Sequence, residues 1–151
     1  MATFERADAS TPPASDLLEA MIVELEPLYG RIDVPGAPTA GPADFSPPGG
    51  SFLVGFEDGQ PICCGGIKEL PDGACEVKRM YVVPGARGRG VAKELLVALE
   101  DEARALGYSV ARLDTGPHQP HAEKMYRDAG YADIANFNAN PFASYWGEKR
   151  L

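Results

Sequence analysis

Residues 87–92, which read Arg-Gly-Arg-Gly-Val-Ala, have the composition of an anion-binding loop. They lie where the pattern of an apolar strand ends and that of an amphipathic helix begins. The first N–H groups of a helix lack internal partners, and the helix dipole places about half a positive charge there. Gly88 and Gly90 allow a ligand close to the main chain, and Arg87 and Arg89 suit phosphate oxygens. The segment therefore predicts a pyrophosphate site.

Two other phosphate motifs compete with this interpretation. No GxxxxGK[ST] string exists, so the chain has no P-loop. A dinucleotide fingerprint would begin at Gly88, but Lys93 occupies the place of its third small residue. Asp114 would then stand near the position of the ribose-binding acid. The strand before the segment belongs to hairpins rather than to a crossover unit, which disfavours a nucleotide-binding oxidoreductase but leaves it open.

This loop and a second motif resemble the GNAT superfamily of acetyl-CoA-dependent N-acetyltransferases. The family loop reads [RQ]-x-x-G-x-[GA], which residues 87–92 match, and its last helix carries a tyrosine followed by Gly-aromatic. Here these are Tyr126 and Gly130-Tyr131, with one helix and one strand between the motifs. The resemblance covers about residues 51–150 and is strongest over 75–131.

The resemblance implies how acetyl-CoA binds. Main-chain amides of the glycine loop would hold the pyrophosphate together with the Arg87 side chain; these residues are Gly88, Arg89, Gly90, Val91 and Ala92. The main chain of the preceding strand would pair with the pantetheine arm; these residues are Met80, Tyr81 and Val82. An amide near Met80 would donate to the acetyl carbonyl. Gln119 stands seven residues before the tyrosine, where family members often carry an asparagine that contacts CoA.

The resemblance also implies two catalytic side chains. A lysine-like amine has a pKa near 10.4, so its neutral form costs about 4–5 kcal/mol at pH 7 and a base or water chain is needed. Glu76 stands where some family members place a catalytic glutamate, and its alternative is an ion pair with Lys78 or Arg79. Tyr126 would protonate the departing thiolate, and its alternative is a packed helix aromatic.

The other residues that could act in catalysis or metal binding are weaker candidates. Strand alternation predicts that Glu76, Lys78 and Met80 share one face, with Cys75, Val77 and Arg79 on the other. His118 and His121 have no third ligand at a suitable spacing, so no metal site is expected, although either could assist as a base. Cys63, Cys64 and Cys75 are expected to be small buried hydrophobes.

The net charge of the chain indicates which classes of partner it is expected to bind. The 151 residues carry a net charge of −8, which disfavours nucleic acid and anionic membranes and favours a small cationic acceptor. Residues 78–93 nevertheless contain five basic side chains and no acid, as a pocket for one small polyanion would. No apolar run approaches a membrane span and residues 1–10 are not a signal peptide, so the cytoplasm is expected.

The elements predict one mixed α/β domain over residues 1–151. The expected order is strand Thr3–Arg6, a helix capped by Thr11 and ending or kinking near Glu26 and Pro27, strands Ser51–Glu57, Ile62–Leu70 and Ala74–Val83, a helix from the glycine loop to Gly107, strand Ser109–Leu113, helix Gln119–Ala129 and strand Ser144–Arg150. The resemblance implies a three-layer fold, with a mostly antiparallel sheet of six to seven strands and about four helices.

Two segments carry special composition. Nine of the sixteen residues 35–50 are Pro or Gly, which predicts a loop without regular structure that either covers a binding site or is a surface linker. Gly65-Gly66 predicts a bulge or a close backbone approach.

The expected activity is acetyl transfer to a small-molecule amine by direct attack in a ternary complex. A non-catalytic acyl-CoA-binding module stays open, and a homodimer is common among the proteins it resembles.

Overall fold

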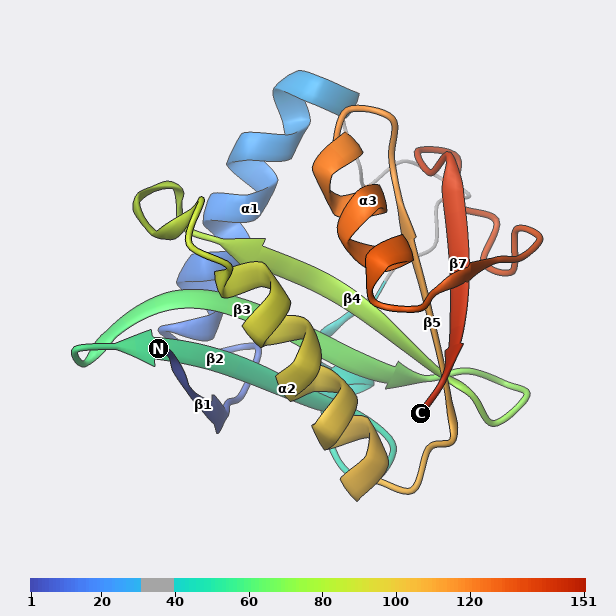
Figure 1. The fold of residues 1–151 in the computed structure, drawn as a ribbon. Coiled ribbons are helices and arrows are strands. Elements are labelled where there is room, and N and C mark those ends of the chain that lie inside the picture. Colours follow the sequence, from blue (N-terminus) through green and yellow to red (C-terminus); the bar gives the residue numbers. More distant parts are fainter. Residues whose placement is uncertain (31–39) are drawn as a thin grey trace.

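A computed structural model describes residues 1–30 and 40–151, which form one seven-stranded sheet (Figure 1). The strand order is β1-β2-β3-β4-β5-β7-β6, and only β4 and β5 pair in parallel. The strands are β1 Thr3–Arg6, β2 Ser51–Glu57, β3 Gln60–Glu69, β4 Cys75–Val82, β5 Val110–Thr115, β6 Ala132–Asp133 and β7 Tyr145–Arg150. Every predicted strand is present within two residues at each end. The short β6 was not predicted.

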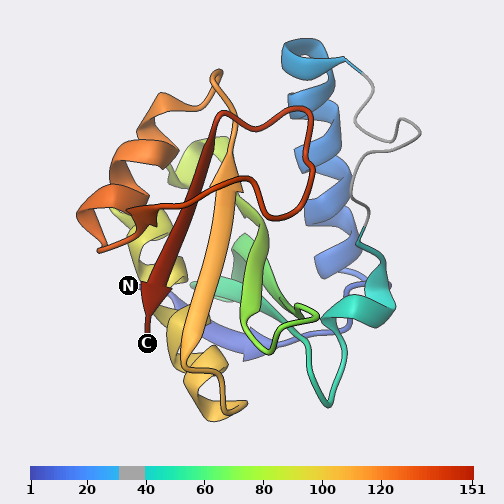
Figure 2. The same ribbon diagram turned by 90° about the vertical axis from the view of Figure 1, so that its right-hand side faces the viewer.

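The helices form the two outer layers of the predicted three-layer fold. They are α1 Ala14–Tyr29, α2 Val91–Ala105 and α3 Pro120–Asp128. Figure 2 shows α1 on one side of the sheet and α2 and α3 on the other. The described residues thus contain three α-helices and two 3₁₀ turns, where about four helices were expected. None of these helices is long and apolar enough to cross a membrane.

Helix α1 packs through Leu17 and Met21, which are four residues apart and bury against the sheet. The predicted cap is wrong, because Pro13 occupies the cap position and the Thr11 hydroxyl donates to the carbonyl of Asp8 instead. Pro27 does not end the helix. It lies in the last turn, and α1 continues to Tyr29 before Gly30 stops it at a φ of 74°.

Helix α2 presents the expected apolar stripe to the other face of the sheet, where Leu95 and Leu99 are fully buried. Gly107, at a φ of 97°, ends it as predicted. The close approach predicted at Gly65 is also confirmed, because a Cβ there would lie 2.7 Å from Leu99 Cδ1. Gly65 therefore allows α2 to sit directly on the sheet.

The Pro/Gly-rich segment is only partly a loop. Residues 31–39 lie outside the described part of the chain. Pro42–Phe45 forms a 3₁₀ turn, so the prediction of no regular structure is wrong there. Phe45 is buried against Phe52 with their ring centroids 5.5 Å apart, and a Cβ at Gly66 would meet the Phe45 ring at 2.4 Å. This turn closes the core beneath α1.

Strands β4 and β5 diverge. Their register covers only Cys75 with Ala111 and Glu76 with Arg112, and Figure 1 shows them separating beyond that point. Because α2 connects these two parallel strands, β4 does belong to a crossover unit, contrary to the expectation that it belongs to hairpins alone. The edge of β4 that faces β5 is therefore not paired with β5 from Val77 to Val82.

Candidate active site

The glycine loop connects the end of β4 to the start of α2, as predicted. A 3₁₀ turn, Pro84–Ala86, reverses the chain after β4, and Gly88 and Gly90 both have a φ of 81°. Positive φ strongly favours glycine. A Cβ at either glycine would meet no atom within 4 Å, so the loop is open on its outer side.

The N–H groups at the start of α2 point out of the helix. The first hydrogen bond of the helical ladder runs from Glu94 N to Gly90 O, at 3.2 Å. The N–H groups of Val91, Ala92 and Lys93 therefore have no helical carbonyl one turn earlier to which they could donate. Together with the helix dipole, these N–H groups are the donors that the predicted pyrophosphate site requires, and anion binding there stays a prediction.

The two loop arginines are held by carboxylates. Arg87 donates to both oxygens of Glu24 on α1, at 2.7 and 2.6 Å, and to the carbonyl of Val82 at 2.9 Å. Arg89 pairs with Glu57 at 3.0 Å. The hydrogen bond from Arg87 holds the pKa of Glu24 below its ordinary value, although burial opposes this shift. A phosphate at the loop would have to replace these carboxylates.

A β-bulge in β4 changes the predicted faces. Arg79 and Met80 together oppose Gly65, and Arg79 has a φ of 62°. Glu76 and Lys78 share a face as predicted. Met80 packs instead into the core on the α2 side, with Val77, so its predicted place beside Glu76 is wrong. Strict alternation fails because the bulge adds one residue to the strand.

Tyr126 on α3 reaches this bulge. Its side chain is 7% exposed, and its hydroxyl donates to Met80 Sδ at 3.5 Å. Burial, and secondarily the charge of Asp114, raises the pKa of Tyr126 above its ordinary value. The phenol therefore keeps its proton at neutral pH. The structure thus brings together Met80 and Tyr126, two residues that the sequence analysis named for different roles.

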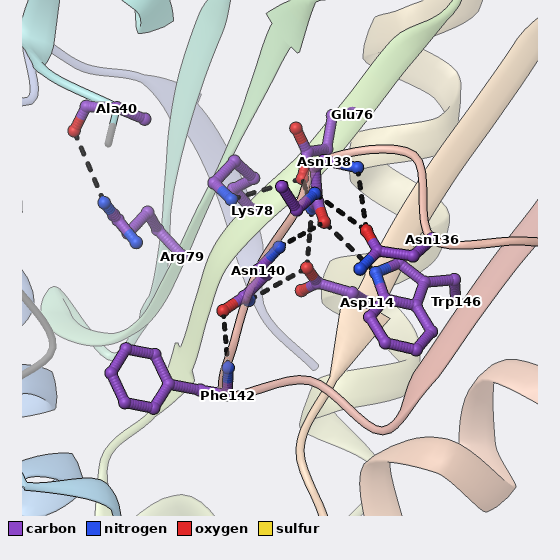
Figure 3. A network of polar contacts seen from close by, with 11 residues as sticks. Ala40, Glu76, Lys78, Arg79, Asp114, Asn136, Asn138, Asn140, Phe142 and Trp146 are labelled. Atoms are coloured by element: carbon purple, nitrogen blue, oxygen red, sulfur yellow. Dashed lines mark hydrogen bonds and ion pairs between the residues drawn. The ribbon is translucent and has the colours of Figure 1, made fainter. Parts of the chain in front are cut away.

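Glu76 is buried in a polar network on the opposite face of β4 (Figure 3). Glu76 as a whole is 2% exposed. Its carboxylate accepts hydrogen bonds from Lys78 Nζ at 3.2 Å and from Asn138 Nδ2 at 2.9 Å. The ion pair with Lys78, which was the alternative to a catalytic role, is therefore present. The catalytic role itself stays a prediction.

The segment between β6 and β7 supplies the rest of this network, which sequence analysis missed. Asn138 Nδ2 also donates to Asp114 at 2.6 Å, and Asn140 donates to the same carboxylate at 3.0 Å. Trp146 Nε1 donates to Asn138 Oδ1 at 3.1 Å. The alternating asparagines at 136, 138 and 140 were the available signal. Asp114 had been considered only as a ribose-binding acid.

Gln119 lies exposed at the N-terminal cap of α3, and its contact with CoA stays a prediction. Its side-chain oxygen is 3.5 Å from the hydroxyl of Tyr29, which ends α1. The same hydroxyl accepts from the main-chain N–H of His118 at 3.1 Å. Tyr29 therefore ties the end of α1 to the turn before α3.

The remaining candidates are the two histidines and the three cysteines, of which the cysteines are buried as predicted. His118 and His121 are exposed. All three cysteines are buried, and burial raises the pKa of Cys63 to about 11 and those of Cys64 and Cys75 to about 12. In the described part of the chain, no three His, Cys, Asp or Glu side chains are grouped to hold a metal ion.

Solved structures of other proteins have a similar fold. An acyl-CoA N-acyltransferase from Klebsiella pneumoniae is 28% identical, with a TM-score of 0.78 over 100% of this chain and 98% of that chain. A GNAT family acetyltransferase from Elizabethkingia anophelis, solved with acetyl-CoA bound, is 16% identical, with a TM-score of 0.71 over 99% of this chain and 98% of that one. The second likeness concerns the fold alone.

Comparison with known sequences gives the family. An IAA acetyltransferase from Azospirillum brasilense is 44% identical over 87 residues, which are 57% of this chain and 57% of that protein. An uncharacterised N-acetyltransferase of Escherichia coli, YjgM, is 31% identical over 93 residues, 60% of this chain and 56% of that protein. The matched region thus spans less than two thirds of either relative. Residues 18–131 match the acetyltransferase (GNAT) family, and the chain belongs to that family.

Proposed function

We propose that this protein transfers the acetyl group of acetyl-CoA to a primary amine of a small acceptor. The observation that carries the proposal is the contact between the Tyr126 hydroxyl and Met80, at 3.5 Å, beside the bulge of β4. It puts a proton donor next to the stretch of main chain assigned to the thioester. The glycine loop at the end of the same strand supplies the phosphate site.

The residues of the glycine loop and of β4 fit acetyl-CoA from its pyrophosphate to its pantetheine arm. The open loop at Gly88 and Gly90 leaves room for a pyrophosphate against the first N–H groups of α2. Arg87 and Arg89 would exchange Glu24 and Glu57 for phosphate oxygens. The main chain from Met80 to Val82 would pair with the pantetheine arm, because β5 has diverged from that edge of β4.

Acetyl-CoA supplies the thioester, and the acceptor amine attacks its carbonyl carbon directly. A C–N bond forms and the C–S bond breaks. The described residues include all three cysteines, and each is a buried thiol with a raised pKa, which makes a prior acetyl-enzyme on cysteine unfavourable. A main-chain N–H near Met80 would donate to the carbonyl oxygen as it gains charge.

Two protons move in this scheme. Glu76 accepts the proton of the amine, acting through water because its side chain lies on the opposite face of β4 from Met80. Tyr126 gives its phenolic proton to the departing sulfur. Burial raises the pKa of Tyr126, so the phenol carries its proton before the reaction begins. Water then returns a proton to Tyr126.

The acceptor end lies where α1 approaches the segment between β6 and β7. Tyr29 and Phe142 meet there with ring centroids 6.2 Å apart. The net charge of −8 favours an acceptor that carries positive charge. A non-catalytic acyl-CoA-binding module is the second candidate, because the glycine loop alone would serve it equally well.

Calorimetry with acetyl-CoA tests the cofactor site. Gly90→Glu adds a side chain and a negative charge where the pyrophosphate would lie, so we expect the dissociation constant to rise at least about 10-fold, since like charges in contact cost more than 1.4 kcal/mol. Gly73→Glu is the matched control. Gly73 also has a positive φ and open space around it, but it lies in the turn between β3 and β4.

Two further readouts separate the candidates. In a thermal-shift assay, acetyl-CoA and CoA should stabilise the protein while NAD and NADP should not. CoA release with a panel of primary amines distinguishes an enzyme from a binding module. Equal acetyl-CoA affinity in Gly90→Glu and wild type would reject the assigned loop, and binding without turnover on any amine would favour the module.

A further inference from the structure

Arg79 is placed beside the reaction centre by the bulge of β4. It is the extra residue of the bulge, at a φ of 62°, and it immediately precedes Met80. A non-glycine residue at positive φ inside a strand is uncommon. The bulge therefore directs a long cationic side chain to a place that regular alternation would not give it.

The guanidinium of Arg79 has few partners. Within the described residues it makes one hydrogen bond, from Nη2 to the carbonyl of Ala40 at 3.4 Å, and no ion pair. Figure 3 shows it directed toward Ala40 and away from the Glu76 network. The other described arginine without an ion pair is Arg150, which is exposed.

This situation is costly for a half-buried charge. Burial lowers the pKa of Arg79 below its ordinary value, while Glu76 and Asp114 act in the opposite direction without contacting it. Buried charges are normally paired. In the same molecule, the buried carboxylate of Glu100 accepts from Lys149 and Tyr131.

The nearby carboxylates are already satisfied by other donors. Glu76 accepts from Lys78 and Asn138, and Asp114 accepts from the amides of Asn138 and Asn140. These contacts leave the planar fork of the Arg79 guanidinium for an anion from outside the network. That fork matches a carboxylate, which it can bind through two parallel hydrogen bonds.

We propose that Arg79 binds a carboxylate of the acceptor, so that the acceptor is a small amine that also carries a carboxylate, such as an amino acid. This inference rests on the proposed acetyltransferase function. When its carboxylate is bound to Arg79, the amine of such a substrate lies toward the neighbouring residue Met80, where the thioester is proposed to bind. A singly charged carboxylate suits the site better than a phosphate dianion, because Glu76 and Asp114 keep negative charge nearby.

Matched pairs of acceptors test the proposal. CoA release is measured at saturating acetyl-CoA with alanine, serine, methionine, phenylalanine, lysine and glutamate, and with the primary amide of each. For the amino acids that serve as acceptors, kcat/KM should exceed that of the amide by about 10- to 100-fold, the range of a charge-assisted hydrogen bond. The amides have the more acidic ammonium groups and hence more neutral amine, so amine basicity would produce the opposite preference.

Variants assign the preference to Arg79. Arg79→Gln should reduce kcat/KM for the acids to the level of the amides and leave the amides unchanged, while Arg79→Lys should keep part of the preference. Arg150→Gln is the control and should behave as wild type. If Arg79→Gln does not fold, the Arg79→Lys variant and the wild-type ratio still decide the matter.

The outcomes separate this proposal from the one on which it rests. Amides acetylated as fast as acids, no turnover on any pair, or an acid preference that survives in Arg79→Gln would each overturn it. If simple amines are acetylated while the acids are not preferred, the acetyltransferase proposal stands and only the carboxylate fails. If wild type binds no acetyl-CoA in calorimetry, both proposals fail.

Discussion

At the residue scale, Tyr126→Phe tests the proposed acid. The variant loses the hydroxyl that contacts Met80 Sδ but keeps the buried ring. We expect kcat to fall by about 10²-fold, the lower range for general acid catalysis, with little change in the KM for acetyl-CoA. The measurement is the initial rate of CoA release with an accepted amine.

Tyr108→Phe is the matched control for that experiment. Tyr108 is also partly buried and its hydroxyl donates to Gly49 O at 2.5 Å, on a part of the fold that no step of the reaction uses. Its kcat should stay at the wild-type value. A Tyr126→Phe enzyme as fast as wild type would remove Tyr126 from the mechanism.

The positions of Tyr126 and the two loop glycines could be predicted from the sequence. Each belongs to a short motif whose chemistry is local: a phenol on a helix, and two positive-φ residues before a helix. Arg79 could not be assigned in the same way, because its orientation depends on one extra residue in β4 that no residue type indicates.

The helices and strands could be predicted from local sequence patterns, whereas the structure of the segments that connect them could not. The strands that became β2, β3 and β4 were predicted close to their observed bounds, and Gly107 predicted the end of α2. The 3₁₀ turn at Pro42–Phe45 was missed because its Pro/Gly composition conceals one buried aromatic residue. The segment between β6 and β7 was missed because asparagines alone do not indicate which carboxylates they reach.

At the element scale, Asn138→Asp tests whether this segment is fixed to β4 and β5. The change places a third carboxylate against Glu76 and Asp114, which now accept from the Asn138 amide. Lost hydrogen bonds to charged groups and like-charge repulsion should lower the free energy of unfolding by about 2–4 kcal/mol. Urea unfolding at pH 7 measures this loss.

Asn136→Asp is the control for that variant. Asn136 Oδ1 only accepts, from the main-chain N–H groups of Asn138 and Ala139, so a carboxylate can replace it. Its unfolding free energy should stay within about 0.5 kcal/mol of wild type, as for most surface substitutions. Equal stability of the two variants would contradict the role assigned to Asn138.

At the scale of the whole molecule, all six tyrosines are placed where burial raises their pKa; they are Tyr29, Tyr81, Tyr108, Tyr126, Tyr131 and Tyr145. In the unfolded chain these phenols lose their protons near pH 10, while the folded chain retains them. The folded state then binds more protons. The stability that the tyrosines contribute is full below pH 10 and decreases as pH rises above it.

Urea unfolding between pH 8 and 11 measures this effect, with an expected slope of up to about 1.4 kcal/mol per pH unit for each tyrosine. Tyr126→Phe should have a shallower slope because it removes one of the six. Stability that is constant up to pH 11 would contradict the burial of these hydroxyls.

The overall architecture could be predicted because two motifs in the right order already imply the fold between them. The divergence of β4 from β5 is a property of the assembled sheet, in which only two residues of each strand pair. No local pattern states where such pairing stops. That divergence nevertheless leaves the main chain from Met80 to Val82 unpaired with β5, as the proposed pantetheine site requires.

A crystal structure of the protein with acetyl-CoA would test this arrangement most directly. We predict that the pyrophosphate lies on the main-chain N–H groups of residues 88–92, that the pantetheine arm runs along β4, and that the thioester sulfur lies within hydrogen-bonding reach of the Tyr126 hydroxyl. Acetyl-CoA bound at another surface, or with its thioester remote from Met80 and Tyr126, would contradict it.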